Sequence, residues 1–287
     1  MARAEPGSSA LLGGSTAAGS VAGATAILRG AGIPTPRLDA ELDPAAARLL
    51  AGWVERRATG EPVAYIRGFK EWLSLRIATD ARALIPRPET ELLAEAAISE
   101  ISARLVRDDA PLQAWDVATG SGAVALAVAL RFRTAISLGR LQLAASDLSA
   151  EALELASENL AAHRVSGLVT LACGDLLEPA VAAARGIDLL IANLPYLTST
   201  EAEATGGSID WEPRGALDGG RDGLDLLRRL IVALPQRLSR DGVALLEIGA
   251  GQADAVRALV AALDVRTAVT TLRDLSAIER VVRVALV

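Results

Sequence analysis

The stretch Gln113-Ala114-Trp115-Asp116-Val117-Ala118-Thr119-Gly120-Ser121-Gly122 decides the fold of this chain. Its first five residues read as a strand, and residues 123–130, which follow at once, read as a helix. The small residues between them let the backbone turn sharply and approach a ligand closely. The free N–H groups at the start of such a helix suit a carboxylate or a phosphate. Alone, the stretch predicts a strand–turn–helix unit, either with a ligand at the turn or as a tight turn without one.

Strands and helices alternate along the chain after Pro88. This order predicts a mainly parallel sheet covered by helices on both faces. The last two strands are joined by a short connection, which predicts an antiparallel hairpin at the sheet edge. The expected strands are 113–117, 141–146, 169–173, 187–192, 242–248, 266–271 and 279–287, and the expected helices are 90–106, 123–130, 150–163, 224–238 and 252–263. The sequence therefore predicts an α/β fold with a seven-stranded, mainly parallel sheet.

The part of the chain before this alternating region is organised differently. An Ala- and Gly-rich segment, 15–29, and a second segment, 43–57, read as short helices. Residues 63–77 alternate in polarity, which predicts a hairpin. We predict a flexible tail at 1–14, a small helical domain at 15–62, a β-hairpin and Pro-rich linker at 63–88, and the α/β domain at 89–287.

Composition excludes several classes of function. The net charge is −6 and the pI about 5.1, which argues against general nucleic-acid binding. Cys173 and His163 are the only residues of their types, so we expect no disulfide, no Cys-based metal site and no histidine-dependent hydrolysis. The start does not read as a signal peptide, and no uncharged apolar run reaches the roughly 18 residues of a membrane span. We expect a cytoplasmic protein without a metal.

Two acids follow the next expected strands. Asp147 can accept both hydroxyls of a ribose, and Asp175 can accept from an adenine amine, although either could simply cap its helix. Both NAD and S-adenosylmethionine contain adenosine. Asp116 disfavours a pyrophosphate but can receive the ammonium of a methionine moiety, and no hydride-transfer site is found. We therefore expect S-adenosylmethionine.

The tetrapeptide Asn193-Leu194-Pro195-Tyr196 follows the strand at 187–192. Pro195 restrains Leu194 to an extended conformation, so backbone carbonyls can point outward beside the Asn193 amide oxygen. Tyr196 adds a flat face. Two acceptors beside an aromatic ring suit a planar –NH2 group, either a carboxamide or a base amine.

Together these residues resemble the class I S-adenosylmethionine-dependent methyltransferases, which share a Rossmann-like sheet. More narrowly, the chain resembles the protein-(glutamine-N5) methyltransferases that modify peptide-chain release factors. The most family-specific stretch is Ile85-Pro86-Arg87-Pro88-Glu89-Thr90-Glu91. The other matching stretches are 36–42, 60–66, 116–122, 174–176, 193–196, 212–217, 219–225 and 246–249.

The resemblance implies methyl transfer to the side-chain nitrogen of a glutamine, the Gly-Gly-Gln glutamine of release factors. It assigns the cofactor to Ala118, Thr119, Gly120, Ser121, Gly122, Asp147, Asp175, Leu176 and Asn193. It assigns the substrate amide to Asn193, Leu194, Pro195 and Tyr196, with Asn193 and Tyr196 as the catalytic residues.

The chain departs from the family at three places. Leu194 stands for a proline and keeps the carbonyl, and Ala118 stands for a glycine, which the loop tolerates if its φ is negative. The helical region between Glu41 and Trp53 is shorter by about one or two helices, as judged by the resemblance. Three alternatives stay open: a ribosomal-protein glutamine, an exocyclic base amine, and a non-catalytic cofactor-binding module.

Overall fold

The computed structural model describes residues 21–31, 50–107, 110–182 and 186–287, and two compact units make up the chain. The smaller unit comprises 1–67 with 206–211, and the larger comprises 68–205 with 212–287. The described helices of the smaller unit are α2 (Val21–Gly30), α4 (Leu50–Ala58), α5 (Val63–Arg67) and η4 (Ile209–Trp211). The predicted tail at 1–14, and the starts of the two predicted N-terminal helices, lie outside the described residues. The predicted extents of the domains stay predictions.

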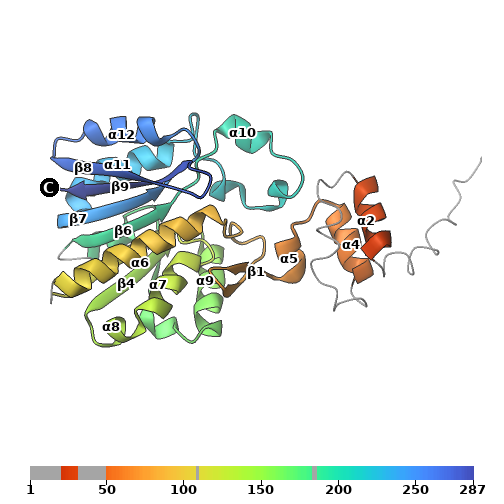
Figure 1. Ribbon diagram of the computed structural model, residues 1–287, viewed down its shortest axis with the longest axis horizontal. Helices are drawn as coiled ribbons and strands as arrows, with labels where there is room; N and C mark the ends of the chain where they lie inside the picture. Colours follow the sequence, from red (N-terminus) through yellow and green to blue (C-terminus); the bar gives the residue numbers. More distant parts are fainter. Residues whose placement is uncertain (1–20, 32–49, 108–109, 183–185) are drawn as a thin grey trace, which may run out of the picture. The chain divides into compact units, whose positions relative to one another are not determined.

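The larger unit is built on a seven-stranded sheet in the order β5-β4-β3-β6-β7-β9-β8 (Figure 1). Neighbouring strands from β5 to β7 are parallel, whereas β9 is antiparallel to both β7 and β8. The predicted α/β fold and C-terminal hairpin are thus confirmed. The strands are β3 (Leu112–Val117), β4 (Leu141–Asp147), β5 (Thr170–Cys173), β6 (Ile187–Asn193), β7 (Leu238–Glu247), β8 (Thr267–Arg273) and β9 (Glu279–Leu286).

Strand β6 shows why this apolar sequence becomes a central strand. Successive side chains of a strand point to opposite faces of the sheet. Leu189 and Ile191 enter the core under one helical layer, and Leu190 and Ala192 enter the core under the other. Because both faces are covered, the strand is apolar throughout rather than alternating.

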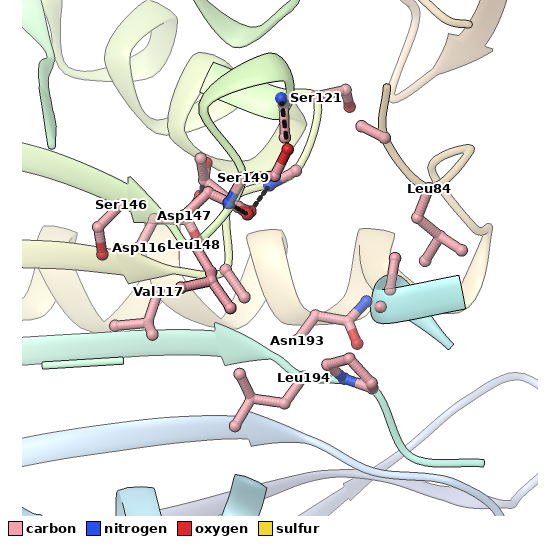
Figure 2. A pocket seen from close by; sticks show the side chains of 18 of the residues that line it. Leu84, Asp116, Val117, Ser121, Ser146, Asp147, Leu148, Ser149, Asn193 and Leu194 are labelled. Carbon is pink, nitrogen blue, oxygen red and sulfur yellow. Dashed lines mark hydrogen bonds between the residues drawn. The ribbon is translucent and has the colours of Figure 1, made fainter. Parts of the chain in front are cut away.

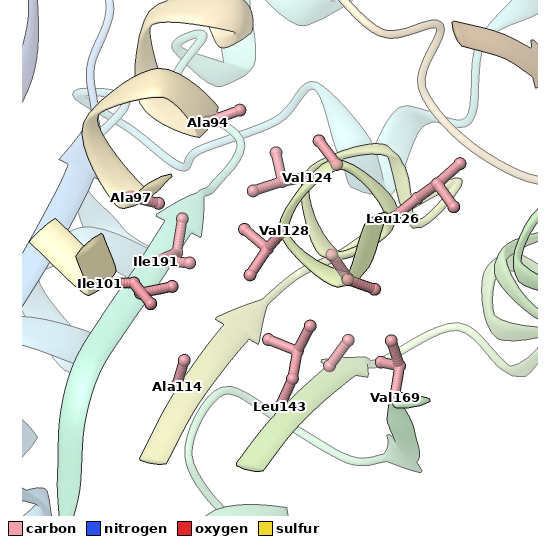
Figure 3. Packing of buried hydrophobic residues seen from close by; sticks show 14 of the residues in the cluster. Ala94, Ala97, Ile101, Ala114, Val124, Leu126, Val128, Leu143, Val169 and Ile191 are labelled. Carbon is pink, nitrogen blue, oxygen red and sulfur yellow. The ribbon is translucent and has the colours of Figure 1, made fainter. Parts of the chain in front are cut away.

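Helices cover both faces of the sheet. On one face α6 (Glu89–Arg107) and α7 (Ala123–Arg131) pack on the sheet through Ile101, Val124 and Val128 (Figure 3). On the other face α11 (Asp225–Arg237) and α12 (Ala253–Ala261) bury Leu230, Leu234 and other apolar residues. The remaining helices are α8 (Arg133–Ser137), α9 (Ala150–Ala162), α10 (Ser199–Glu203), η2 (Ser166–Leu168), η3 (Pro179–Ala182) and η5 (Arg214–Ala216). None of the helices in the described residues is long and apolar enough to cross a membrane.

The predicted hairpin at 63–77 was partly wrong. Residues Val63–Arg67 form α5, and only β1 (Phe69–Trp72) and β2 (Leu75–Ala78) form the hairpin. Pro62 cannot donate to a sheet ladder, and its carbonyl instead accepts from the Ile66 N–H at 3.0 Å. This bond starts a helical turn in sequence that alternates too briefly to specify a strand.

Candidate active site

A pocket of about 290 Å³ lies at the carboxyl ends of β3, β4, β5 and β6 (Figure 2). The order of the strands reverses between β3 and β6, where the loops that follow the two strands diverge. Ligands of open α/β sheets bind in this kind of crevice. The pocket is lined by ten of the predicted site residues, namely Ala118, Thr119, Gly120, Ser121, Asp147, Asp175, Leu176, Asn193, Leu194 and Pro195.

The loop between β3 and α7 is held by Asp116. Its Oδ2 accepts from the Thr119 hydroxyl at 2.6 Å and from the Ala125 N–H at 3.2 Å. Burial raises the pKa of Asp116 to about 7, and the two hydrogen bonds oppose that rise. Asp116 also lines the pocket, and its predicted contact with an ammonium stays a prediction.

Three residues of this loop have left-handed backbones, namely Ala118, Gly120 and Gly122, and the first and last of them differ in how they tolerate it. Gly122 has a φ of 78°, and a Cβ there would lie 2.9 Å from the Ala156 Cβ of α9, so the helix packing requires glycine. Gly122 therefore shapes the turn but does not line the pocket. Ala118 has a φ of 56°, so the condition for an alanine to be tolerated here, a negative φ, is not met. The loop keeps the conformation of a glycine and strains the alanine.

Asp147 ties β4 to the loop after β3. Its Oδ2 accepts from the Gly120 N–H and its Oδ1 from the Ser149 N–H, both at 2.9 Å. Burial raises the pKa of Asp147, and these backbone hydrogen bonds oppose the rise. Each carboxylate oxygen keeps a lone pair, so the group can still accept hydroxyl donors.

Asp175 follows β5 and is paired with a residue on α11. Its Oδ2 lies 2.5 Å from Arg229 Nη2. Leu176 adds an apolar contact to the same end of the pocket, and Leu148, 72% exposed, adds another beside Asp147. Two apolar side chains next to two carboxylates suit a planar base attached to a sugar.

Asn193 ends β6 and is held from behind. Its Nδ2 donates to Thr90 Oγ1 at 3.1 Å, and Thr90 Oγ1 donates to Glu247 Oε1 at 3.2 Å. Among the described residues no group donates to Asn193 Oδ1 or to the Leu194 carbonyl. The two predicted acceptors are therefore both available for a ligand.

The other residues of the tetrapeptide have different surroundings. Leu194 is 2% exposed as a whole residue, and its side chain belongs to the core between the sheet and α11. Tyr196 does not line the pocket. Its carbonyl accepts from Gln252 Nε2 at 3.0 Å, and burial, followed by the nearby charge of Glu247, raises the pKa of its hydroxyl. The predicted contact of Tyr196 with a substrate amide stays a prediction.

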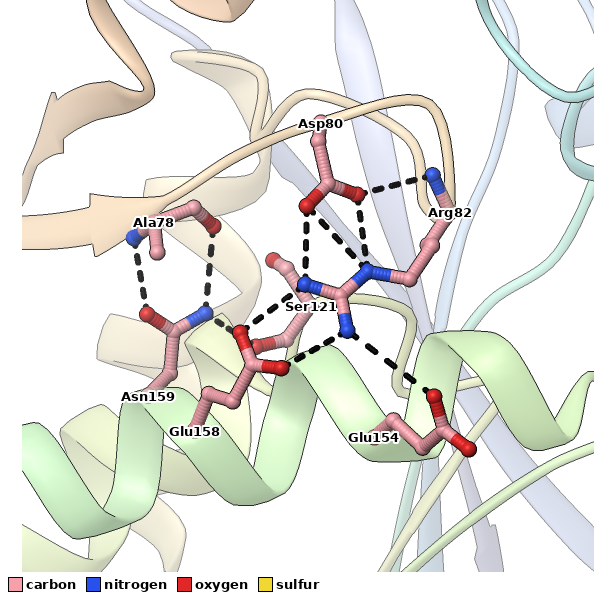
Figure 4. Close-up of polar contacts among 7 residues, drawn as sticks. All are labelled: Ala78, Asp80, Arg82, Ser121, Glu154, Glu158 and Asn159. Carbon is pink, nitrogen blue, oxygen red and sulfur yellow. Dashed lines mark hydrogen bonds and ion pairs between the residues drawn. The ribbon is translucent and has the colours of Figure 1, made fainter.

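Asn159 of α9 fixes the wall of the pocket beside the loop (Figure 4). Its amide accepts from the Ala78 N–H at 2.7 Å and donates to the carbonyls of Ala78 and Ser121. The guanidinium of Arg82, which lines the pocket, is paired with Asp80 and Glu158, each at 2.8 Å. These ion pairs raise the pKa of Arg82 further, so its charge is balanced before any ligand binds.

Several polar residues of the site, such as Arg82, were not predicted from the sequence, and three of them have an identifiable signal. Arg87 and Thr90 line the pocket, and Glu247 lies behind Thr90. All three fall in stretches that carry the family resemblance, and this was the signal that could have found them. Their roles depend on contacts with strands or loops far along the chain.

The residues present fit S-adenosylmethionine. Among the described residues, the carboxylates of Asp116 and Asp147 line the pocket without a cationic partner. The third lining acid, Asp175, is paired with Arg229, and the two lining arginines, Arg82 and Arg87, are both paired with acids. This balance suits a ligand that carries an ammonium and a sulfonium. Leu148 offers an apolar surface to a base.

Comparison with known proteins decides the family. The release factor glutamine methyltransferase of Bordetella pertussis is 38% identical over 244 residues, which are 84% of this chain and 85% of that protein. The protein of the same name from Moorella thermoacetica is 37% identical, over 79% of this chain and 76% of that protein. The chain belongs to the family of release factor glutamine methyltransferases. No protein-family model matches it.

Membership of this family makes the chain a methyltransferase rather than a non-catalytic binding module. A ribosomal protein uL3 glutamine methyltransferase of Bordetella pertussis is also similar, at 40% identity over 75% of this chain and 68% of that protein. Among solved structures, the catalytic domain of hMettl16 with an RNA hairpin has a TM-score of 0.54 at 14% identity, over 80% of this chain and 81% of that chain. That likeness shows the shared fold.

Proposed function

We propose that this enzyme transfers a methyl group from S-adenosylmethionine to the side-chain amide nitrogen of a glutamine in a peptide-chain release factor. The observation that carries the proposal is the pair of available acceptors, Asn193 Oδ1 and the Leu194 carbonyl, at the pocket. A carboxamide –NH2 has two N–H donors to place against them. The similarity to release factor glutamine methyltransferases supports glutamine as the side chain and a release factor as its owner.

Within the pocket, Asp147 would accept the ribose hydroxyls of the cofactor. Residues Ala118 to Ser121 would hold its methionine part, and Leu148, Asp175 and Leu176 would surround its adenine. When bound, S-adenosylmethionine supplies an electrophilic methyl group on a sulfonium. The sheet places these residues and Asn193 at the ends of adjacent strands, which brings the reacting groups into proximity.

A glutamine amide is a poor nucleophile because its lone pair is delocalised. Asn193 Oδ1 and the Leu194 carbonyl would accept hydrogen bonds from the two N–H groups of the amide. They would thereby hold the nitrogen and favour the positive charge that develops there. As the N–CH3 bond forms, the S–CH3 bond of the sulfonium would break and its electron pair would return to the sulfur, leaving a neutral thioether. The nitrogen would lose one proton, which is released to solvent. No titrating base in contact with the nitrogen is needed.

A second candidate substrate is a glutamine of a ribosomal protein. The 40% identity to a uL3 glutamine methyltransferase favours it, and the chemistry would be the same. An exocyclic base amine is less well supported, because the net charge of −6 disfavours nucleic-acid binding.

The test is transfer of a tritiated methyl group from S-adenosylmethionine to purified release factors, to uL3 and to RNA. We expect label on the Gly-Gly-Gln glutamine of a release factor, and loss of most turnover in Asn193→Ala with cofactor binding unchanged. Label on uL3 alone would move the assignment to the ribosomal protein. Methyl transfer by Asn193→Ala at the rate of the wild type would overturn the proposed role of the acceptor pair.

A further inference from the structure

Asn193, Thr90 and Glu247 come from three different elements. Asn193 and Glu247 are register partners at the ends of the parallel strands β6 and β7, so their side chains point to the same face of the sheet. Thr90 lies in the first turn of α6, which covers that face. The three side chains form a chain of hydrogen bonds from the pocket into the buried interior.

This chain of hydrogen bonds has a direction. A threonine hydroxyl has one hydrogen, and here Thr90 donates it to Glu247 Oε1 while its oxygen accepts from Asn193 Nδ2. If Thr90 donated to Asn193 instead, the amide would be turned over and its Nδ2 would face the pocket. A nitrogen donor there would oppose the N–H donors of a substrate amide. The acceptor on Glu247 therefore decides which end of the Asn193 amide a ligand meets.

A glutamate at position 247 carries a desolvation cost, because its carboxyl group is buried. It is 1% exposed, and within the described part of the chain its Oε2 is buried without a hydrogen-bond partner. Burial raises its pKa to about 7, and the charge of Glu89 adds to that rise. The hydrogen bond from Thr90, the charge of Arg280 and the nearby Asn193 amide oppose it. A proton on Oε2 leaves Oε1 as a carbonyl acceptor, so Thr90 has its acceptor in both protonation states. A buried polar atom without a partner is uncommon in native proteins and calls for an explanation.

We propose that Thr90 and Glu247 are positioning residues, which fix the Asn193 amide with its oxygen toward the substrate. The proposal rests on the proposed function, because it assigns the reason why Asn193 can accept from a glutamine amide. Neither residue touches the reacting atoms in this scheme.

The sequence offers a direct observation of the Asn193 amide. Asn159 and Asn193 are the only asparagines of the chain, so asparagine labelled with ¹⁵N in its side chain gives two pairs of amide signals. Asn193→Ala identifies the Asn193 pair. Asn159, held by Ala78 and Ser121, is an internal reference within the same spectrum.

The decisive variants are Thr90→Val, which keeps the shape of the side chain, and Thr90→Ser, which keeps the hydroxyl. We expect Thr90→Val to shift the Asn193 signals, leave the Asn159 signals, and lower kcat on the order of 10-fold or more with an unchanged Kd for S-adenosylmethionine. Thr90→Ser should restore both signals and kcat. Asn193 signals that stay in place in Thr90→Val would overturn the proposal.

Two further variants separate positioning from a general loss of stability. Glu247→Met leaves Asn193 Oδ1 as the acceptor for Thr90, so the Asn193 signals and kcat should change although neither Thr90 nor Asn193 is altered. Thr271→Val removes a hydroxyl that donates to Glu279 at 2.7 Å on the edge strand β8, and should change neither. An equal loss of kcat in Thr271→Val would count against the proposal.

The spectra need no protein substrate, so they also distinguish the two proposals. A wild-type enzyme that methylates no glutamine overturns the proposed function, while the shift of the Asn193 signals in Thr90→Val still reports the hydrogen-bond chain. Wild-type methylation with full kcat in Thr90→Val overturns only the positioning role.

Discussion

The guanidinium of Arg87 lies 2.5 Å from the carboxylate of Glu212, whose side chain is 1% exposed. The other oxygen of Glu212 accepts from the Ile85 N–H at 3.0 Å, and the Arg87 carbonyl accepts from the indole N–H of Trp72 at 2.9 Å. One buried acid thus joins the Pro-rich linker to the segment 212–217, which contains η5. This segment supplies Pro213 to the lining of the pocket.

Arg87→Met should destabilise the protein strongly. The variant leaves the Glu212 carboxylate buried without its cationic partner. We expect the free energy of unfolding to fall by about 2–3 kcal/mol, which is less than for a fully buried pair because Arg87 is partly exposed. Urea unfolding followed by circular dichroism measures the change.

The matched control for Arg87→Met is the double variant with Glu212→Gln. A neutral amide can keep the bond from Ile85 without a buried charge, so the double variant should recover part of the lost stability. A double variant less stable than Arg87→Met alone would contradict the account.

Ala118→Gly should stabilise the protein. The φ of Ala118 is 56°, and a left-handed backbone costs a residue with a Cβ about 1–2 kcal/mol. Glycine loses more backbone entropy on folding, which leaves a net gain of about 0.5–1 kcal/mol. The melting temperature should rise by a few degrees, as measured by calorimetry.

Gly122→Ala is the opposite change in the same loop. Its φ of 78° and the 2.9 Å approach to Ala156 should make it destabilising, by more than about 1 kcal/mol. Should Ala118→Gly lower the melting temperature, the strain assigned to Ala118 would be wrong.

These two positions show what the sequence could predict. The glycine loop, and the strand and helix on either side of it, followed from periodicity and small residues, and the structure confirmed them. The sign of the φ of Ala118 did not follow from the sequence. The loop also makes contacts with elements far along the chain, such as the packing of Gly122 on Ala156 of α9, and local sequence does not reveal these contacts.

The same limit applies to the chain of hydrogen bonds that runs from Asn193 through Thr90 to Glu247. The end of β6 was predicted, and Asn193 was identified from its chemistry. Thr90 and Glu247 could not be connected to it, since their contact depends on β7 lying beside β6 and on α6 covering that face. The order of strands in the sheet is not a local property of sequence. The prediction of a strand at the start of the hairpin failed for a more local reason. The alternation of polarity is brief there, and one helical turn after Pro62 forms α5 instead.

Leu194→Ala should separate stability from chemistry. The Leu194 side chain is buried in the core on the α11 face, so its truncation should cost about 2–4 kcal/mol. The backbone carbonyl remains and is still restrained by Pro195. We therefore expect a lower melting temperature but a kcat within a few-fold of the wild type, measured well below the new melting temperature.

A matched control for Leu194→Ala is Leu230→Ala, a truncation in the same core on α11. It should lose similar stability and also keep its kcat. A large loss of kcat in Leu194→Ala alone would mean that the side chain, and not only the carbonyl, serves the reaction.

The stability of the wild type should fall as the pH rises through neutrality, in part because of Glu247. Burial raises its pKa from 4.5 to about 7, so the folded state binds the proton more tightly than the unfolded state does. The stabilisation is complete below pH 4.5 and is lost as the pH rises through the folded pKa near 7. The loss is of the order of 1–3 kcal/mol. Asp116, whose pKa is also raised to about 7, acts in the same direction.

Glu247→Gln should remove the share of this pH dependence that comes from Glu247. A neutral amide does not titrate, so the free energy of unfolding of the variant should fall less between about pH 5 and about pH 8 than that of the wild type. Urea unfolding at both pH values measures the difference, and Asp116 should keep a residual slope in the variant. Identical slopes in the two proteins would show that Glu247 is ionised in the folded state throughout this range.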